Sequence, residues 1–144
     1  MIAVNLTNQI NRPVEEVWNY LAEPANATSW MTGVIEAGPI SEGPIGVGTK
    51  FRKVQRFLGW RTEMIYEAVE YEPNRTLTYK TVYGPLSYRG SITVESVETG
   101  TTLVYAGRGE LAGLFKLAEP IFGRIAARQF RNDFNTLRKL LETG

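Results

Sequence analysis

Residues 76–109 decide the fold, and they read TLTYKTVYGPLSYRGSITVESVETGTTLVYAGRG. The stretch contains three runs rich in β-branched and aromatic residues, which favour strands: Thr76–Tyr83, Leu86–Val97 and Thr101–Gly109. A Gly-Pro pair separates the first two runs, and a Glu-Thr-Gly turn separates the last two. Because strands joined by such short turns pair antiparallel, the stretch predicts three neighbouring strands of one antiparallel sheet.

Four further strands are expected upstream of this stretch. Ile2–Ile10 alternates apolar and polar residues, which is typical of a strand with one buried face. Val34–Ile40, Thr49–Phe57 and Trp60–Tyr71 are bounded by turn residues, and the last two should form a hairpin across the short link Leu58-Gly59. The sheet should therefore contain about seven strands.

Helical segments lie on both sides of the strand region. Pro13 suits the first position of a helix that ends before Pro24, and Ala25–Trp30 predicts a second, short helix. Leu111–Glu142 has helical periodicity, with a regular helix expected from about Pro120 because glycine and proline interrupt its first part. The order of one strand, two helices, six strands and a long helix is that of the α+β helix-grip fold. In this fold a curved antiparallel sheet wraps a long C-terminal helix around an internal cavity.

Length and charge restrict the possible functions. At 144 residues the chain has the usual length of one domain, so a single domain is expected over residues 1–144. Sixteen basic and fifteen acidic residues give a net charge of +1, which offers nucleic acid no electrostatic surface. No apolar run approaches the roughly 18 residues that span a bilayer, so integral membrane association is not expected.

Cysteine and histidine are both absent. Their absence excludes thiol nucleophiles, imidazole bases and zinc sites with nitrogen or sulfur ligands, and we expect neither a bound metal nor a cofactor. The lack of cysteine fits a reducing compartment, and residues 1–6 show neither a basic leader nor an apolar export segment. We therefore expect a cytoplasmic protein.

Five blocks of sequence occur in an order that resembles one known family. They are Asn11-Arg12-Pro13-Val14-Glu15-Glu16-Val17-Trp18, Trp30 followed by Gly33-Val34, Gly46-Val47-Gly48-Thr49, Tyr71-Glu72-Pro73-Asn74-Arg75-Thr76-Leu77 and Gly100-Thr101-Thr102-Leu103. Together they cover nearly the whole chain and are similar to the polyketide cyclase/dehydrase branch of the START-like (SRPBCC) superfamily. The resemblance implies the helix-grip fold with a deep cavity for lipids, polyketides or other hydrophobic molecules. It leaves the activity open, because functions in the superfamily range from ligand carriers to cyclases.

Aromatic residues on the strands are candidates for lining such a cavity. Residues separated by an even number of positions share a face of a strand, so Trp60 and Met64 project with Tyr66, and Tyr79 projects with Tyr83. Buried phenols need hydrogen-bond partners, so several inward tyrosines suit a hydrated or ligand-filled pocket, with ordinary core packing as the alternative. Apolar residues of the long helix would close the pocket from the other side. The candidate ligand-binding residues are Trp30, Phe51, Trp60, Met64, Tyr66, Tyr79, Tyr83, Tyr88, Tyr105, Arg108, Phe115, Ile121, Phe122, Ile125 and Phe130.

A bulge within the Trp60–Tyr71 strand could shift its register. A slip of one residue would replace Met64 and Tyr66 in the cavity by Ile65 and Glu67.

Most charged residues of the strands are expected on the outer, solvated face of the sheet. Arg108 and Glu110 are a possible exception, because either side chain turned inward could bind a ligand carboxylate or transfer a proton. In the resembling family the cavity mouth lies near the start of the long helix. The segment Gly113 to Gly123 is therefore a candidate gate, since glycine permits hinge motion.

Three functions are consistent with these features. The preferred one is binding or transport of a small hydrophobic or amphipathic ligand. The alternatives are a polyketide-type cyclase or dehydratase that uses tyrosine, arginine or glutamate groups, and an interaction domain whose cavity is vestigial and filled. No motif specific to catalysis is present, so the sequence leaves open whether the protein is an enzyme, and either a monomer or a homodimer is expected.

Overall fold

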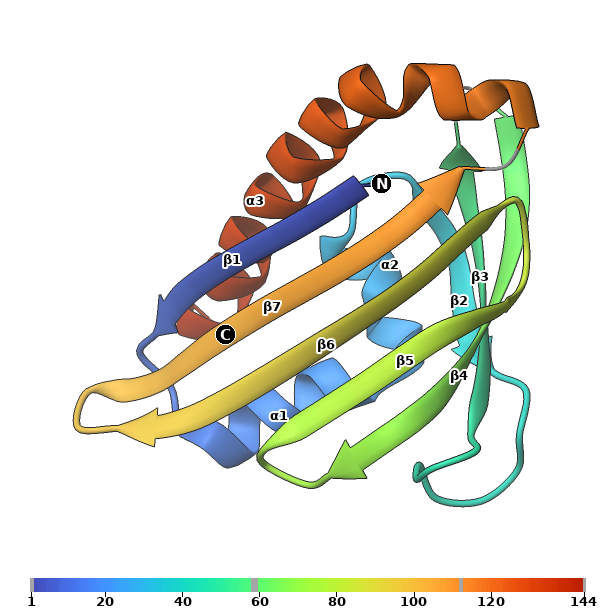
Figure 1. Cartoon of the computed structure of the whole chain (residues 1–144). Coiled ribbons are helices and arrows are strands. Elements are labelled where there is room, and N and C mark those ends of the chain that lie inside the picture. The colour runs from blue at the N-terminus through green and yellow to red at the C-terminus, as the bar shows by residue number, and fades with distance from the viewer. Residues whose placement is uncertain (1, 58–59, 112, 144) are drawn as a thin grey trace.

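The computed structural model describes residues 2–57, 60–111 and 113–143. Within these residues the strands form one seven-stranded antiparallel sheet in the order β1-β7-β6-β5-β4-β3-β2. Figure 1 shows the sheet curving as a shell, with the helices on one side of it. The predicted α+β helix-grip arrangement is confirmed. The strands are β1 (Ile2–Ile10), β2 (Val34–Pro39), β3 (Lys50–Phe57), β4 (Trp60–Glu72), β5 (Thr76–Tyr83), β6 (Leu86–Val97) and β7 (Gly100–Leu111).

Each predicted strand is present with ends that differ by at most two residues. The largest difference is at β7, which continues to Leu111 because its ladder with β6 extends to the pair Leu86 and Leu111. The predicted pairing of β3 with β4 is confirmed, with Phe57 opposite Trp60. The link Leu58-Gly59 lies outside the described residues.

The helices also follow the predicted order. Helix α1 begins one residue after Pro13, and the short second helix is divided into a 3-10 turn and one α-helical turn. The long helix starts at Glu119, after an irregular entry as expected. No described helix combines the length and apolar character that crossing a membrane requires. The helices are α1 (Val14–Ala22), η1 (Pro24–Asn26), α2 (Ala27–Trp30), η2 (Gly113–Ala118) and α3 (Glu119–Thr143).

The sheet presents an apolar face to α3. Along β7 every second residue from Leu103 to Leu111 is buried, including Tyr105, and the residues that alternate with them are exposed. On α3, Phe134 packs 5.1 Å from the ring of Tyr105 and 5.1 Å from that of Trp30, measured between ring centroids. These contacts place the core between the concave face of the sheet and the C-terminal half of α3.

Strand β5 changes register against β4 near its end. Tyr66 lies opposite Thr81, whereas its neighbour Ile65 lies opposite Tyr83, so Val82 is an additional residue on β5. An additional residue reverses the alternation of the side chains that follow it. Tyr83 therefore lies on the outer face and is 59% exposed, which corrects its predicted place beside Tyr79.

On β4 the structure decides between the two registers that the sequence left open, in favour of Met64 and Tyr66 on the inner face. Met64 and Tyr66 are buried, whereas Ile65 and Glu67 are only half-buried.

Arg12 joins the start of α1 to the end of α3. Its Nε donates to the carbonyl oxygen of Leu141 at 2.7 Å, and its Nη2 donates to that of Glu142 at 2.8 Å. The last carbonyls of a helix have no partners within the helix, and a cation there also interacts favourably with the helix dipole. Arg12 therefore serves as a tertiary cap for the long helix.

Replacing this cap should destabilise the fold. We expect Arg12→Ala to lower the free energy of unfolding by about 1–3 kcal/mol, because two charge-assisted hydrogen bonds are lost. Urea titration followed by circular dichroism measures the change. Arg108→Ala, which removes an exposed arginine from the outer face of β7, is the matched control and should have little effect. Equal losses in the two variants would contradict the assigned role of Arg12.

Candidate functional site

Two adjoining cavities lie between the concave face of the sheet and the helices. The larger has a volume of about 290 Å³, and the smaller a volume of about 60 Å³. They share a wall formed by Met31, Lys53, Tyr79 and Phe130. The larger cavity extends along α3 past Phe122, Ile125 and Ala126, and the smaller one extends towards α1 and α2.

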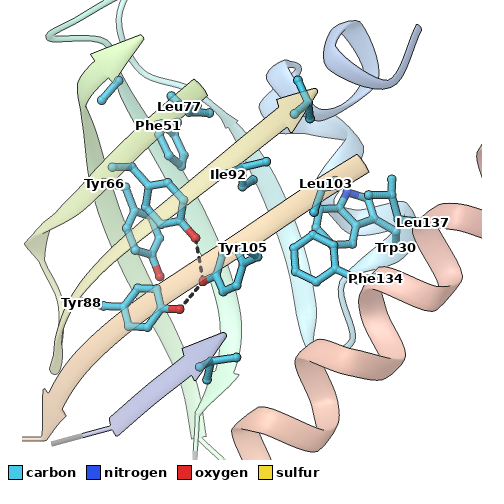
Figure 2. Packing of buried hydrophobic residues seen from close by; sticks show 14 of the residues in the cluster. Trp30, Phe51, Tyr66, Leu77, Tyr88, Ile92, Leu103, Tyr105, Phe134 and Leu137 are labelled. Carbon is cyan, nitrogen blue, oxygen red and sulfur yellow. Dashed lines mark hydrogen bonds between the residues drawn. The ribbon is translucent and has the colours of Figure 1, made fainter. Parts of the chain in front are cut away.

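Three tyrosine hydroxyl groups meet on the sheet side of these cavities. The hydroxyl of Tyr105 forms hydrogen bonds with those of Tyr79, at 3.2 Å, and Tyr88. Figure 2 shows the oxygen of Tyr105 between its two partners. Phe130 of α3 covers this group, with its ring stacked on those of Tyr88 and Tyr105 at centroid distances of 6.3 and 5.2 Å. We call Tyr79, Tyr88 and Tyr105 the tyrosine cluster.

Glycine makes the space that the tyrosine cluster occupies. Gly90 on β6 and Gly107 on β7 lie directly opposite each other. A Cβ atom on Gly90 would lie 2.7 Å from the hydroxyl oxygen of Tyr79, and one on Gly107 would collide with that of Tyr88. Any side chain at these positions would therefore displace the hydroxyls, which explains why strands that otherwise favour β-branched residues contain glycine here.

Burial sets the protonation of these tyrosines. It raises the pKa of Tyr66, Tyr79, Tyr88 and Tyr105 well above the ordinary value for a phenol, and charge repulsion between neighbouring phenolates acts in the same direction. All four hydroxyls are neutral at physiological pH. Each one can donate a single hydrogen bond as well as accept.

Lys53 places a cation inside the same apolar region. The residue is only 8% exposed, and its Nζ lies 5.3 Å from the ring centroid of Tyr66, 5.7 Å from Tyr79 and 5.9 Å from Phe51. Nζ also approaches the sulfur of Met31 at 3.5 Å. Burial lowers the pKa of Lys53 to about 8, although the carboxylate of Asp133 opposes the change. The side chain is therefore mostly charged at neutral pH, and cation–π contacts are its main stabilising interactions.

Asp133 on α3 is the acidic group whose charge acts on Lys53. It is buried, and its Oδ1 accepts hydrogen bonds from the amide of Thr32 at 3.0 Å and from its hydroxyl at 2.7 Å. The pKa of Asp133 is raised overall, because the effect of burial exceeds the lowering effect of the two hydrogen bonds from Thr32. Gln129 donates to the carbonyl oxygen of Thr32 at 2.7 Å, so the loop after α2 is attached to α3 at this point. Among the described residues, no three acidic side chains are grouped as a metal ion would require.

Most of the candidate site residues line one of the two cavities. The nine that do so are Trp30, Phe51, Tyr66, Tyr79, Tyr88, Tyr105, Phe122, Ile125 and Phe130. Met64 points inward and is fully buried, but it lies in the packed core and not on a cavity wall. Trp60 and Phe115 belong by their backbones to β4 and η2, and their side chains lie outside the described part of the structure.

Three candidates are corrected by the structure. Tyr83 borders a shallow depression on the outside of the sheet, because of the register change described above. Arg108 and its possible partner Glu110 are exposed, because the inward positions of β7 are those of Tyr105, Gly107 and Gly109. Ile121 is 68% exposed, because the side of α3 that faces the sheet carries Phe122 and Phe130.

Two polar residues of the site were missed from the sequence. Lys53 follows Phe51 by two positions, and this spacing indicates the same, inner face of the strand. Asp133 follows Phe130 by three positions and precedes Leu137 by four, which places it on the inward side of a helix. Both signals were present, but charged residues of strands and helices were expected to face solvent.

A model of the family described as polyketide cyclase / dehydrase and lipid transport matches residues 1–142. The chain belongs to this family. Its membership confirms the resemblance found in the sequence blocks, and both the family and the fold are consistent with ligand binding in an internal cavity. No curated protein matches the sequence.

Solved structures of low sequence identity share the fold. A START superfamily protein from Mycobacterium smegmatis has a TM-score of 0.84 at 12% identity, over 99% of each chain. The protein TTHA0849 from Thermus thermophilus has a TM-score of 0.82 at 17% identity, over 96% of each chain. The Zhui aromatase/cyclase from Streptomyces sp. R1128 has a TM-score of 0.77 at 16% identity, over 97% of this chain and 93% of that one.

The tight fit of the tyrosine cluster can be tested with one methyl group. Gly107→Ala should push Tyr88 towards the larger cavity, break its hydrogen bond with Tyr105 and lower the free energy of unfolding by about 1–3 kcal/mol. Gly38→Ala, on the edge strand β2, is the matched control because an added Cβ there meets no atom within 4 Å. Urea unfolding should show the loss in the first variant only, and equal stability of the two would refute the proposed fit.

The buried charge of Lys53 should be visible in the pH dependence of stability. The unfolded chain keeps this proton up to the ordinary pKa of 10.5, whereas the folded protein releases it near pH 8. Between these values the unfolded state binds more protons, so the Lys53 contribution to stability rises with pH. Below pH 8 the buried charge opposes folding by a constant amount.

Lys53→Met should therefore stabilise the ligand-free protein at pH 7, by up to roughly 3 kcal/mol, and the difference from wild type should shrink as pH rises to 10. Chemical unfolding at several pH values measures both effects. The raised pKa values of the buried tyrosines act in the opposite direction above pH 10, but both proteins contain them. A variant less stable than wild type at pH 7 would contradict this account.

Proposed function

We propose that this protein binds a small, largely apolar molecule in the larger cavity. The observation that carries this proposal is the cavity itself, which has a volume of about 290 Å³ between the sheet and α3. Ligand pockets begin at about 300 Å³ and combine apolar walls with a few placed polar groups. The volume also equals that of about ten water molecules. A small ligand thus suits this space, and a hollow of this size argues against a vestigial, filled interior.

The walls match such a ligand in chemistry. Tyr66, Tyr88 and Phe130 offer aromatic faces, and Leu86 and Phe122 add further apolar surface. Flat rings stack favourably on aromatic side chains, so an aromatic or polyketide-like ring system is suited to this wall. Lipid transport, which the family description also names, requires the same kind of apolar interior.

The route of entry is proposed to lie at the N-terminal end of α3. Ile125 lines the larger cavity and is 56% exposed, so the cavity approaches the surface beside it. The preceding segment begins at Gly113, whose φ of 60° is a left-handed conformation that favours glycine. Movement of the segment Gly113 to Gly123 about this point would open the cavity, as the sequence suggested.

Cyclisation or dehydration of a polyketide is a second candidate function. The tyrosine cluster favours it, because neutral phenols beside an apolar cavity can donate hydrogen bonds to a carbonyl oxygen that gains negative charge. Product formed in molar excess over the protein from a poly-β-ketone would demonstrate this activity. Stoichiometric binding without conversion would support a carrier.

Other aspects of function remain those expected from the sequence. We propose a cytoplasmic protein, monomeric or homodimeric, whose partner is a small molecule and not nucleic acid. The near-neutral net charge of +1 and the absence of cysteine support these expectations.

Filling the larger cavity should abolish binding. Ala126 lines it from α3, and Ala126→Trp places a bulky ring in the space. We expect the affinity for the neutral fluorescent probe N-phenylnaphthylamine to fall at least tenfold, with an unchanged circular dichroism spectrum. Ala106→Trp, on the outer face of β7, is the matched control and should bind the probe as the wild type does. Equal binding by both variants, or none by the wild type, would refute the proposed site.

A further inference from the structure

Lys53 is the basic residue among the buried side chains of the described part of the structure. It lies on the inner face of β3 between Phe51 and Gln55, and it lines both cavities. Lysine is almost never buried without a partner, because removing an ammonium group from water is highly unfavourable. Its burial therefore needs an explanation that the packing of an apolar core does not provide.

The ammonium group lacks an anionic partner. Among the described residues no carboxylate lies within 4.0 Å of its Nζ. Its hydrogen-bonding contact is the thioether sulfur of Met31, a weak acceptor, although an ammonium group carries three donors. The surrounding aromatic rings stabilise the positive charge but accept none of these hydrogen bonds in the normal way.

Asp133 does not complete the site. Its Oδ1 accepts both hydrogen bonds from Thr32, which hold the carboxylate at the junction of α3 and the loop after α2. Its negative charge favours the protonated form of Lys53 from a distance. The inner face thus has a cation on β3 and an anion on α3 that are not in contact, with the larger cavity lined by both.

We propose that Lys53 binds the carboxylate of an amphipathic ligand, whose ring or chain occupies the larger cavity. This inference rests on the proposed function and specifies the class of molecule bound. A carboxylate supplies the strong acceptor that the ammonium group lacks, and an ion pair in an apolar environment is stronger than one in water. The aromatic rings around Lys53 would then contact the apolar part of the ligand next to the carboxylate.

The charge of the site selects a monoanion. A single buried ammonium balances one negative charge, and Asp133 on the opposite wall repels a second. Arg56, another basic residue that lines the larger cavity, is exposed, so water screens its charge. A phosphate dianion would therefore remain partly uncompensated, whereas a carboxylate matches the site. The position of Lys53 on β3 also orients the ligand, with its acidic end towards the wall shared by the two cavities.

A matched pair of probes tests this proposal. Naphthoate and naphthamide have nearly the same shape, but only naphthoate carries the charge. Each is titrated against protein loaded with N-phenylnaphthylamine, and its dissociation constant is obtained from displacement of this neutral probe. We expect the wild type to bind naphthoate at least tenfold more tightly than naphthamide, because a charge-assisted hydrogen bond replaces a neutral one.

Two variants assign the preference to Lys53. Lys53→Met removes the charge while keeping an apolar side chain of similar length, and it should abolish the preference but retain binding of naphthamide and of the neutral probe. Lys50→Met removes an exposed positive charge from the same strand, and it should keep the preference.

Each result either supports or overturns the proposal. Three kinds of result would overturn the role of Lys53. The wild type could bind the two compounds with equal affinity, or the neutral probe could be displaced by naphthamide alone or by neither compound. The preference for naphthoate could also survive in Lys53→Met. In all of these cases binding of the neutral probe would still support the proposed function. Failure of the wild type to bind the neutral probe would refute the cavity as a ligand site, and the role of Lys53 with it.

Discussion

The packing of α3 against the concave sheet determines which part of the interior is a close-packed core and which part contains a cavity. Towards its C-terminus, α3 directs Phe134, Leu137 and Leu141 at the sheet, and all three are buried. Towards its N-terminus the cavity wall includes the small Ala126 and the polar Gln129. One helix offers only one row of side chains to a curved sheet, so small or polar residues in that row leave the space unfilled. The cavity is a consequence of this uneven distribution of side-chain size.

The sheet contributes a complementary distribution of large and small residues. Tyr79, Tyr88 and Tyr105 project from adjacent strands, and their hydroxyls meet over the paired glycines Gly90 and Gly107. Mutual hydrogen bonds satisfy the buried phenols without a charged partner. The tyrosines therefore form a rigid, neutral wall, so the shape of the cavity is set by side chains that are themselves held in place. A preformed wall of this kind suits a carrier and a cyclase equally, because both must hold an apolar molecule in one orientation.

Lys53 departs from this pattern of satisfied groups. Its buried charge opposes folding, as the lowered pKa indicates, and the described residues supply no counterion in contact with it. Groups that weaken a fold are concentrated at functional sites, where a ligand completes the interaction that the protein leaves unmade. The family to which the chain belongs has a description that covers both chemistry and transport. Individual polar groups such as Lys53, and not the shared fold, must therefore distinguish its members.

The sequence by itself determined the elements and their order, because turn residues and apolar periodicity act over a few neighbouring residues. The runs around Gly84-Pro85 and Glu98-Thr99-Gly100, and the periodic stretch after Pro120, were sufficient to predict the helix-grip fold and most of the aromatic wall. Tyr83 was misplaced because the additional residue Val82 reverses the alternation of β5, and that irregularity exists only in the pairing with β4. The inward positions of Lys53 and Asp133 were readable from periodicity, but their burial was decided by the tertiary structure. Whether a charged side chain on an inner face reaches water depends on what packs opposite it, and here the opposing groups come from strands and a helix distant in sequence.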